Sequence, residues 1–149
     1  MSTITPGGIF GLDYNEGVWT PVVADAASGG NEASLGSAYG HYTKIGNRVT
    51  ITGVINNINT TGQTGGNDVF ITGLPYKAAS LTGTIVFTGS APRITQCTFS
   101  GEYVTPYMQD DTDNVRFHET VSSGNGDFLT ISDLTSGTSD INFQLSYIA

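Results

Sequence analysis

Short runs of strand-forming residues, separated by clusters of Gly, Asn, Asp and Ser, recur along the chain and constrain its fold more than any other feature. Within residues 48–58, Val49 and Ile51 share one face of an extended strand, and threonines occupy the other face. The last run, 140–148, alternates in the same way between apolar and polar side chains. Because no run of about 10–15 residues with helical spacing intervenes, the pattern excludes βαβ units and predicts an all-β protein.

The turn clusters divide the chain into about eight to ten expected strands, a number typical of a β-sandwich or barrel. The strands are expected at 18–23, 39–44, 48–58, 68–72, 81–87, 93–99, 103–108, 114–121, 128–131 and 140–148. The turns between them are expected at 46–47, 60–67, 89–92, 110–114, 122–127 and 136–140. This pattern favours a jelly-roll-like antiparallel β-sandwich over residues 17–149, with an immunoglobulin-like sandwich as the alternative. A chain of 149 residues has the length of one domain.

The charge balance excludes two classes of partner. Thirteen Asp and Glu residues face 5 Lys and Arg residues, which gives a net charge of −8. Binding to nucleic acid or to an anionic membrane surface needs clustered Lys and Arg, so neither partner is expected. No apolar run approaches the roughly 18–20 residues of a membrane helix, and the first residues lack the basic and apolar regions of a signal peptide.

Residues 1–16 differ from the rest of the chain. They are too rich in glycine for a helix and too apolar for a solvated tail. We expect an extended N-terminal arm that docks on another surface, through the apolar residues Ile4, Pro6, Ile9 and Phe10.

Catalytic signals are weak. Neither His41 nor His118 has a nucleophile or a partner base at a recognisable spacing, and no Gly-x-Ser-x-Gly sequence occurs. The single cysteine, Cys97, is expected to be a buried inert thiol and cannot form an intrachain disulfide. We therefore expect a protein without enzymatic activity and without a cofactor.

The densest acidic segment contains Asp110, Asp111 and Asp113. Carboxylates in a loop can ligate a cation such as Ca²⁺ through oxygen, but the spacing fails the EF-hand pattern. The segment is therefore either an exposed turn or a cation loop, and the sequence leaves the metal unidentified. The role of the aromatic residues is equally open, since they can form platforms on which sugars stack, or they can pack in the core or in a subunit interface.

Three segments together form a recognisable pattern. They are Gly17-Val18-Trp19-Thr20-Pro21, then Gly40-His41-Tyr42-Thr43-Lys44-Ile45-Gly46-Asn47-Arg48-Val49, and then Gly73-Leu74-Pro75-Tyr76. Their order and spacing resemble a β-sandwich module of tailed-bacteriophage virion proteins, which often forms the C-terminal part of tail fibres and tailspikes. The resemblance covers about residues 17–149. The C-terminal end departs from this pattern. The module is expected to end in a small residue followed by Gly-x-Tyr, whereas this chain has Gln144-Leu145-Ser146-Tyr147.

These motifs also have physical interpretations. Gly46-Asn47 is a tight turn, which pairs 39–44 with 48–58 as a hairpin. Trp19 is expected to be a large apolar side chain that anchors the first strand to the sandwich. Packing in the core or in a subunit interface is expected for four aromatic residues, which are Trp19, Tyr42, Phe143 and Tyr147.

The resemblance implies a homotrimeric virion component on the outside of the particle. Our first hypothesis is a capsid decoration (cement) protein whose arm binds the major capsid protein, because the chain is short and has no fibre shaft. The second is a tail fibre or short fibre tip protein, attached to a tail adaptor, whose loops 60–67 and 122–127 contact host surface glycans. The third, a polysaccharide-cleaving enzyme, lacks a convincing catalytic set. The host and the location on the virion stay open.

Overall fold

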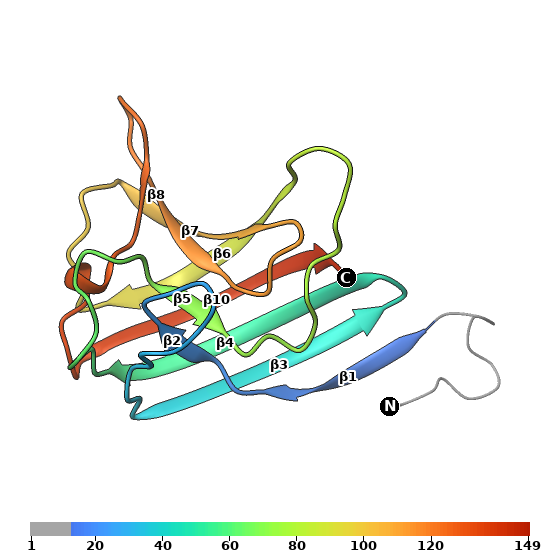
Figure 1. Ribbon diagram of the computed structural model, residues 1–149, viewed down its shortest axis with the longest axis horizontal. Helices are drawn as coiled ribbons and strands as arrows, with labels where there is room; N and C mark the ends of the chain where they lie inside the picture. Colours follow the sequence, from blue (N-terminus) through green and yellow to red (C-terminus); the bar gives the residue numbers. More distant parts are fainter. Residues whose placement is uncertain (1–12) are drawn as a thin grey trace.

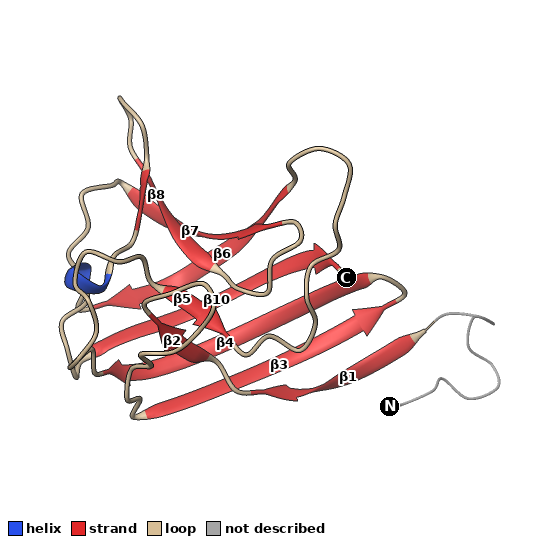
Figure 2. Ribbon diagram, viewed as in Figure 1, coloured by secondary structure: helices blue, strands red, loops and turns tan. Residues whose placement is uncertain are grey.

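The computed structural model describes residues 13–149, which form an antiparallel all-β fold (Figure 1). The elements are β1 Tyr14–Trp19, β2 Val22–Ala24, β3 Ser37–Ile45, β4 Arg48–Ile58, β5 Phe70–Thr72, β6 Val86–Thr95, β7 Tyr103–Gln109, β8 Arg116–Thr120, β9 Asp127–Phe128, the 3-10 helix η1 Ile131–Asp133 and β10 Ser139–Ile148. Figure 2 shows that η1 is a small element beside the strands. The predicted all-β class is confirmed, and no helix in the described part of the chain is long and apolar enough to span a membrane.

The strands form a large sheet and a small one. The large sheet has the order β1-β3-β4-β10-β6-β7-β8-β9, and β2 pairs with β5. Strand β6 serves both halves of the large sheet, because its residues 89–95 pair with β10 and its residues 86–88 pair with β7. Strands β7 and β8 therefore turn away from β1, β3, β4 and β10 (Figure 1). A bridge between Ile71 and Val115 joins β5 to the start of β8, which completes a second layer.

The core lies between these layers. The alternation predicted for 48–58 is confirmed, since Val49 and Ile51 are fully buried and the threonines between and after them are exposed. The apolar residues of β10 face the same interior. The opposite layer contributes Met108 and Phe117, both fully buried. A single continuous cluster of buried side chains results, as expected for one domain of this size.

The turn predicted at 89–92 is wrong, because these residues lie inside β6. A Cβ on Gly89 would come within 1.9 Å of the Gln144 carbonyl oxygen, so glycine at this position permits close approach of β6 to β10 rather than a chain reversal. Pro92 lies where the register with β10 shifts between Asn142 and Gln144. A bulge tolerates proline, since a ladder hydrogen bond is already missing there.

Several predicted strands also have different boundaries. Residues 81–85 of the strand predicted at 81–87 lie outside any strand, because β6 begins at Val86. The strand predicted at 128–131 ends at Phe128 in β9, and η1 begins at Ile131. The strand predicted at 18–23 is divided into β1 and β2 around Pro21, which fixes the backbone and lacks an N–H donor. The strand predicted at 93–99 ends at Thr95, because Gln96 adopts a left-handed backbone with φ of 56°. Only an isolated bridge from Cys97 to Leu134 continues the pairing beyond that point.

The first strand begins earlier than expected. Strand β1 starts at Tyr14, so residues 14–16 pair with β3 and belong to the sheet. The predicted boundary between residues 16 and 17 therefore falls inside β1. The predicted docking residues of the arm lie outside the described residues, and they are Ile4, Pro6, Ile9 and Phe10.

Candidate functional site

Two motif residues, Trp19 and Gly40, lie in a row of paired residues that crosses four strands. Trp19 pairs with Gly40, Gly40 with Gly53, and Gly53 with Phe143. A Cβ on Gly40 would come within 2.3 Å of the indole Nε1, and a Cβ on Gly53 within 2.4 Å of the Phe143 ring. The two rings therefore lie over the two glycines and meet edge to face, with centroids 6.3 Å apart. Glycine is required at both central positions because the rings occupy the space of its missing side chain.

Trp19 is held by hydrogen bonds as well as by packing. Its Nε1 donates to the Thr52 carbonyl at 3.1 Å and to the His41 carbonyl at 3.3 Å. The side chain is 7% exposed. An indole N–H that is buried needs such an acceptor, so the geometry fixes β1 on β3 and β4.

Tyr76, the last residue of the third motif, connects the remaining motif residues. Its ring meets Tyr42 edge to face at 5.6 Å, and the Lys44 ammonium lies 5.7 Å from its centroid. Its hydroxyl accepts a hydrogen bond from the Asn15 amide at 2.5 Å, and its carbonyl accepts one from the Tyr147 hydroxyl at 2.7 Å. Burial raises the pKa of Tyr147, which stays a neutral donor. The three motif segments are thus packing elements of one cluster inside the domain.

The structure does not bring the three candidate cation ligands together. Both carboxylate oxygens of Asp110 accept backbone hydrogen bonds, from Leu81 at 3.2 Å and from Ile85 at 3.1 Å. Asp111 has a φ of 59° and pairs with Lys77 at 2.7 Å, while Asp113 is exposed. Among residues 13–149, no group of three or more His, Cys, Asp or Glu side chains is arranged to hold a metal ion. The geometry favours the interpretation of this segment as a turn.

A second acidic group ties two loops together. Asp25, which is 6% exposed, accepts hydrogen bonds from the Asn31 side chain at 2.6 Å and from the Thr64 backbone N–H at 2.8 Å. The hydrogen bond from the Thr64 backbone holds the pKa of Asp25 below its ordinary value. The loop expected at 60–67 is therefore fixed to the β2–β3 connection.

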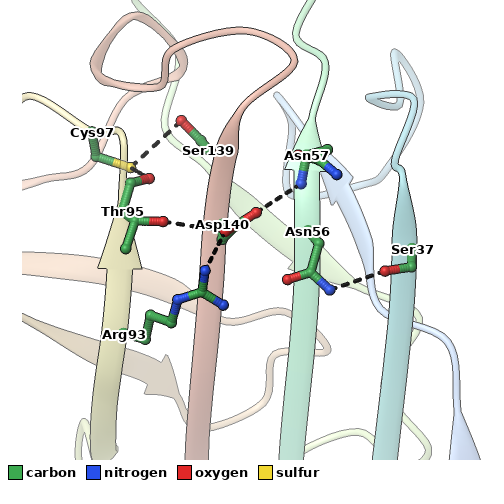
Figure 3. A network of polar contacts seen from close by, with 8 residues as sticks. All are labelled: Ser37, Asn56, Asn57, Arg93, Thr95, Cys97, Ser139 and Asp140. Atoms are coloured by element: carbon green, nitrogen blue, oxygen red, sulfur yellow. Dashed lines mark hydrogen bonds and ion pairs between the residues drawn. The ribbon is translucent and has the colours of Figure 1, made fainter.

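The polar network in Figure 3 closes one end of the first layer. Asp140 pairs with Arg93 at 2.7 Å and accepts a hydrogen bond from the Asn57 backbone N–H at 2.9 Å. Beside it, the Cys97 thiol lies 3.7 Å from the Ser139 hydroxyl. Burial raises the pKa of Cys97, so the thiol is neutral at pH 7 and a poor nucleophile. These contacts hold β4, β10 and the end of β6 together.

The two histidines lie far apart in the fold. His41 is exposed on β3, on the opposite face of the strand from Gly40. His118 lies on β8 beside the rings of Tyr107 and Phe128, at centroid distances of 6.3 and 5.3 Å, and these two rings lie 5.1 Å from each other. In the described part of the chain, neither imidazole is hydrogen-bonded to a serine hydroxyl or to the thiol.

Two surfaces have features that sequence reasoning missed. The outer face of β1 and β3 exposes Val18 by 75%, Tyr39 by 63% and Ile45 by 45%. On the second layer, rings from β5, β7 and β9 surround the guanidinium of Arg116. Arg116 and His118 are two residues apart on β8 and share one face, but their partners on other strands follow only from the pairing.

Comparison with known proteins gives a likeness of fold. No protein-family model matches the chain, and no curated protein sequence matches it. Among solved structures, the fold is similar to part of the Dettilon tailspike protein (gp208), with a TM-score of 0.64 and 19% sequence identity. The match covers 91% of this chain and 24% of the tailspike chain. The expected fold likeness to a tailspike β-module is thereby confirmed.

Proposed function

We propose that the protein is a structural component of a bacteriophage virion and that it is associated with the tail. The observation that carries this proposal is the likeness of nearly the whole described fold to one part of a tailspike protein. The motif cluster supports it, because several residues that carried the phage resemblance, among them Trp19, Tyr42 and Tyr76, pack in or against the domain core. A fold alone does not specify a function, so the virion role is a proposal by analogy.

Tail association is favoured over capsid decoration on this basis. The preference for decoration came from the short chain and the N-terminal arm. The chain spans about a quarter of the tailspike that it matches, so its length does not separate a decoration protein from a tail module. The arm residues lie outside the described part of the chain, and they support neither location.

We further propose that the protein assembles as a homotrimer through the outer face of β1 and β3. Val18, Tyr39 and Ile45 expose apolar surface there, beyond what a single sandwich needs to bury. Glu16 lies on this face, and Arg48, at the start of the adjoining β4, pairs with Ile45 at its edge, so these two charges cancel, whereas the chain carries −8 in total. Copies of so acidic a chain repel one another least where the local charge is zero, which favours a second copy as the occupant.

The proposed role is non-catalytic. The polar side chains that are held rigidly, such as Asp25 and Asp140, join loops and strand ends. Their oxygens are already occupied by protein donors, so they support architecture. Incubation of the isolated protein with capsular polysaccharide or cell-wall material should release no fragments, and any depolymerisation would contradict a purely structural role.

The location is tested by gold-labelled antibody against this chain, applied to purified particles of the phage that encodes it. Label at the tail is the expected result, and label over the capsid shell would replace tail association with decoration. The trimer is tested by light scattering of the wild type and of Val18→Glu. We expect a trimeric mass for the wild type and a monomeric mass for the variant, with Glu102→Gln on a different surface as the matched control. A wild-type monomer would contradict the trimer proposal.

A further inference from the structure

A cavity of about 350 Å³ opens at one end of the second layer. Its wall comes from β8, β9, the connection between β6 and β7, and the segment around η1. Three carboxyl groups line it, from Glu119 on β8, Asp127 on β9 and Asp133 in η1, and we name it the Glu119–Asp133 cavity. Among the described residues that form its wall, none is Lys, Arg or His. The wall therefore gathers negative charge without a cation to offset it.

Glu119 is the most deeply buried of the three acidic residues, since it is only 3% exposed. Its Oε2 accepts hydrogen bonds from the backbone N–H groups of Ser100 at 3.0 Å and Gly101 at 3.1 Å. Its Oε1 accepts no hydrogen bond from residues 13–149, yet it is not sealed off from solvent. This oxygen therefore faces the cavity that Glu119 lines. A carboxylate oxygen in so buried a position is stabilised when a ligand supplies the missing donor.

Glu119 and Asp127 are direct partners across β8 and β9. Side chains of paired residues share one face of a sheet, with Cβ atoms about 4.5–5.5 Å apart, and like charges in this arrangement are destabilising. Arg116 and His118 lie on the opposite face of β8. The four ion pairs among the described residues use other acids, which are Asp13, Asp68, Asp111 and Asp140. The pairing of Glu119 with Asp127 thus leaves a repulsion that a bound cation would remove.

The arrangement suits an organic cation better than a metal ion. Ca²⁺ takes about 6–8 oxygen ligands at about 2.3–2.6 Å around one point. Among residues 13–149, no three acidic side chains converge in this way. Asp133 keeps Oδ1 for a ligand, because its Oδ2 already accepts hydrogen bonds from the Thr130 backbone N–H and hydroxyl, each at 2.7 Å. Carboxylates that are spread along a wall are matched by two ammonium groups on a short alkyl chain.

We propose that the Glu119–Asp133 cavity binds a small organic dication with two primary ammonium groups. One ammonium lies between Glu119 and Asp127, where its three N–H donors supply Oε1 and offset the paired charges. The other lies at Asp133, and the alkyl chain packs on Phe99, which is half-buried against the core. The volume lies near the lower end for ligand pockets, about 300 Å³, which suits a chain of a few carbons. The net charge of −8 favours the entry of a cation.

The binding test is calorimetric titration of the isolated full-length protein with 1,4-diaminobutane at neutral pH and low ionic strength. Its neutral analogue, 1,4-butanediol, and CaCl₂ are titrated in parallel. We expect saturable binding of the diamine at one site, weakened by added salt, and no binding of the diol. Glu119→Gln should weaken diamine binding about tenfold or more, because a charged hydrogen bond in a buried position is lost. Asp127→Asn, at an exposed position, should weaken it about two- to fivefold.

Glu32→Gln is the matched control, because it removes the same charge from an exposed position on the β2–β3 connection, outside the cavity. It should leave the affinity for the diamine unchanged. Glu119 also holds the backbone of Ser100 and Gly101, so folding of Glu119→Gln is verified by circular dichroism, and Asp127→Asn provides the test if that variant unfolds.

The proposal is overturned if the diamine does not bind, if the diol binds equally well, or if Glu32→Gln weakens binding as much as Asp127→Asn. The last result would indicate general attraction to an acidic chain. Displacement of the diamine by Ca²⁺ at lower concentration would overturn the choice of an organic cation. The titration does not depend on where the protein lies on the virion, so this inference and the proposed function can fail separately.

Discussion

Replacement of Gly40 by alanine tests whether the motif glycines exist to seat aromatic rings. The new Cβ would lie 2.3 Å from Trp19 Nε1 and 2.5 Å from Trp19 Cε2, closer than any real contact. A buried indole cannot yield as a flexible side chain does, so the ring must shift. We therefore expect overpacking strain together with damage to the hydrogen bonds from Nε1 to Thr52 and His41.

Overpacking costs about 1–3 kcal/mol, and an unsatisfied buried N–H costs about 1–3 kcal/mol. A combined loss of about 3 kcal/mol in the free energy of unfolding corresponds to a fall of roughly 6–12 °C in Tm for a domain of this size. Chemical denaturation and calorimetry measure the two quantities. Gly66→Ala is the matched control, because a Cβ there meets nothing within 4 Å and its backbone is not left-handed.

The same substitution in a Trp19→Leu background tests whether the contact with the indole ring causes the loss of stability. Trp19→Leu removes the ring that the new methyl group would strike, so Gly40→Ala should cost much less in that background, and the coupling energy should exceed about 1 kcal/mol. If Gly40→Ala changes stability by less than about 0.5 kcal/mol in the wild-type background, or costs the same in both, the steric explanation of the motif is refuted.

Three further outcomes follow from the same structure. Tyr147→Phe leaves the Tyr76 carbonyl without its buried donor and should lower the free energy of unfolding by about 1–3 kcal/mol in urea denaturation. Asp25 has a pKa below its ordinary value of 3.8, so its contribution to stability is complete above that pH and is lost as the pH falls through the lowered value. The stability gap between the wild type and Asp25→Asn should therefore be constant near neutrality and shrink in acid, and a gap that grows in acid would contradict this. Deletion of 1–16 removes three residues of β1 pairing and should lower the melting temperature relative to deletion of 1–12.

Much of the fold could be predicted because its strands alternate clearly. The runs at 48–58 and 140–148 are two-faced, and the structure places them side by side with their apolar residues inward. The turn predicted at 89–92 failed because Gly-Ser-Ala-Pro has the local chemistry of a turn. Only the close approach of β10 shows that Gly89 serves a strand crossing and that Pro92 lies at a bulge.

The aromatic residues show where sequence reasoning ends. Trp19, Phe143 and Tyr147 could be singled out as aromatic side chains expected in the core or in an interface, and the structure places all three in the core. The arrangement of the Phe70, Tyr107 and Phe128 rings around Arg116 could not be predicted, since these residues come from four strands that are distant in sequence. Only the register of β7 with β8 brings Tyr107 beside Arg116.

The copy number of this chain per particle tests the central claim most directly. Quantitative mass spectrometry of purified virions gives it as a ratio to the major capsid protein. A tail-associated module predicts a low number, from a few to some tens of copies and divisible by three for a trimer. Hundreds of copies would contradict tail association and would identify a protein that covers the capsid.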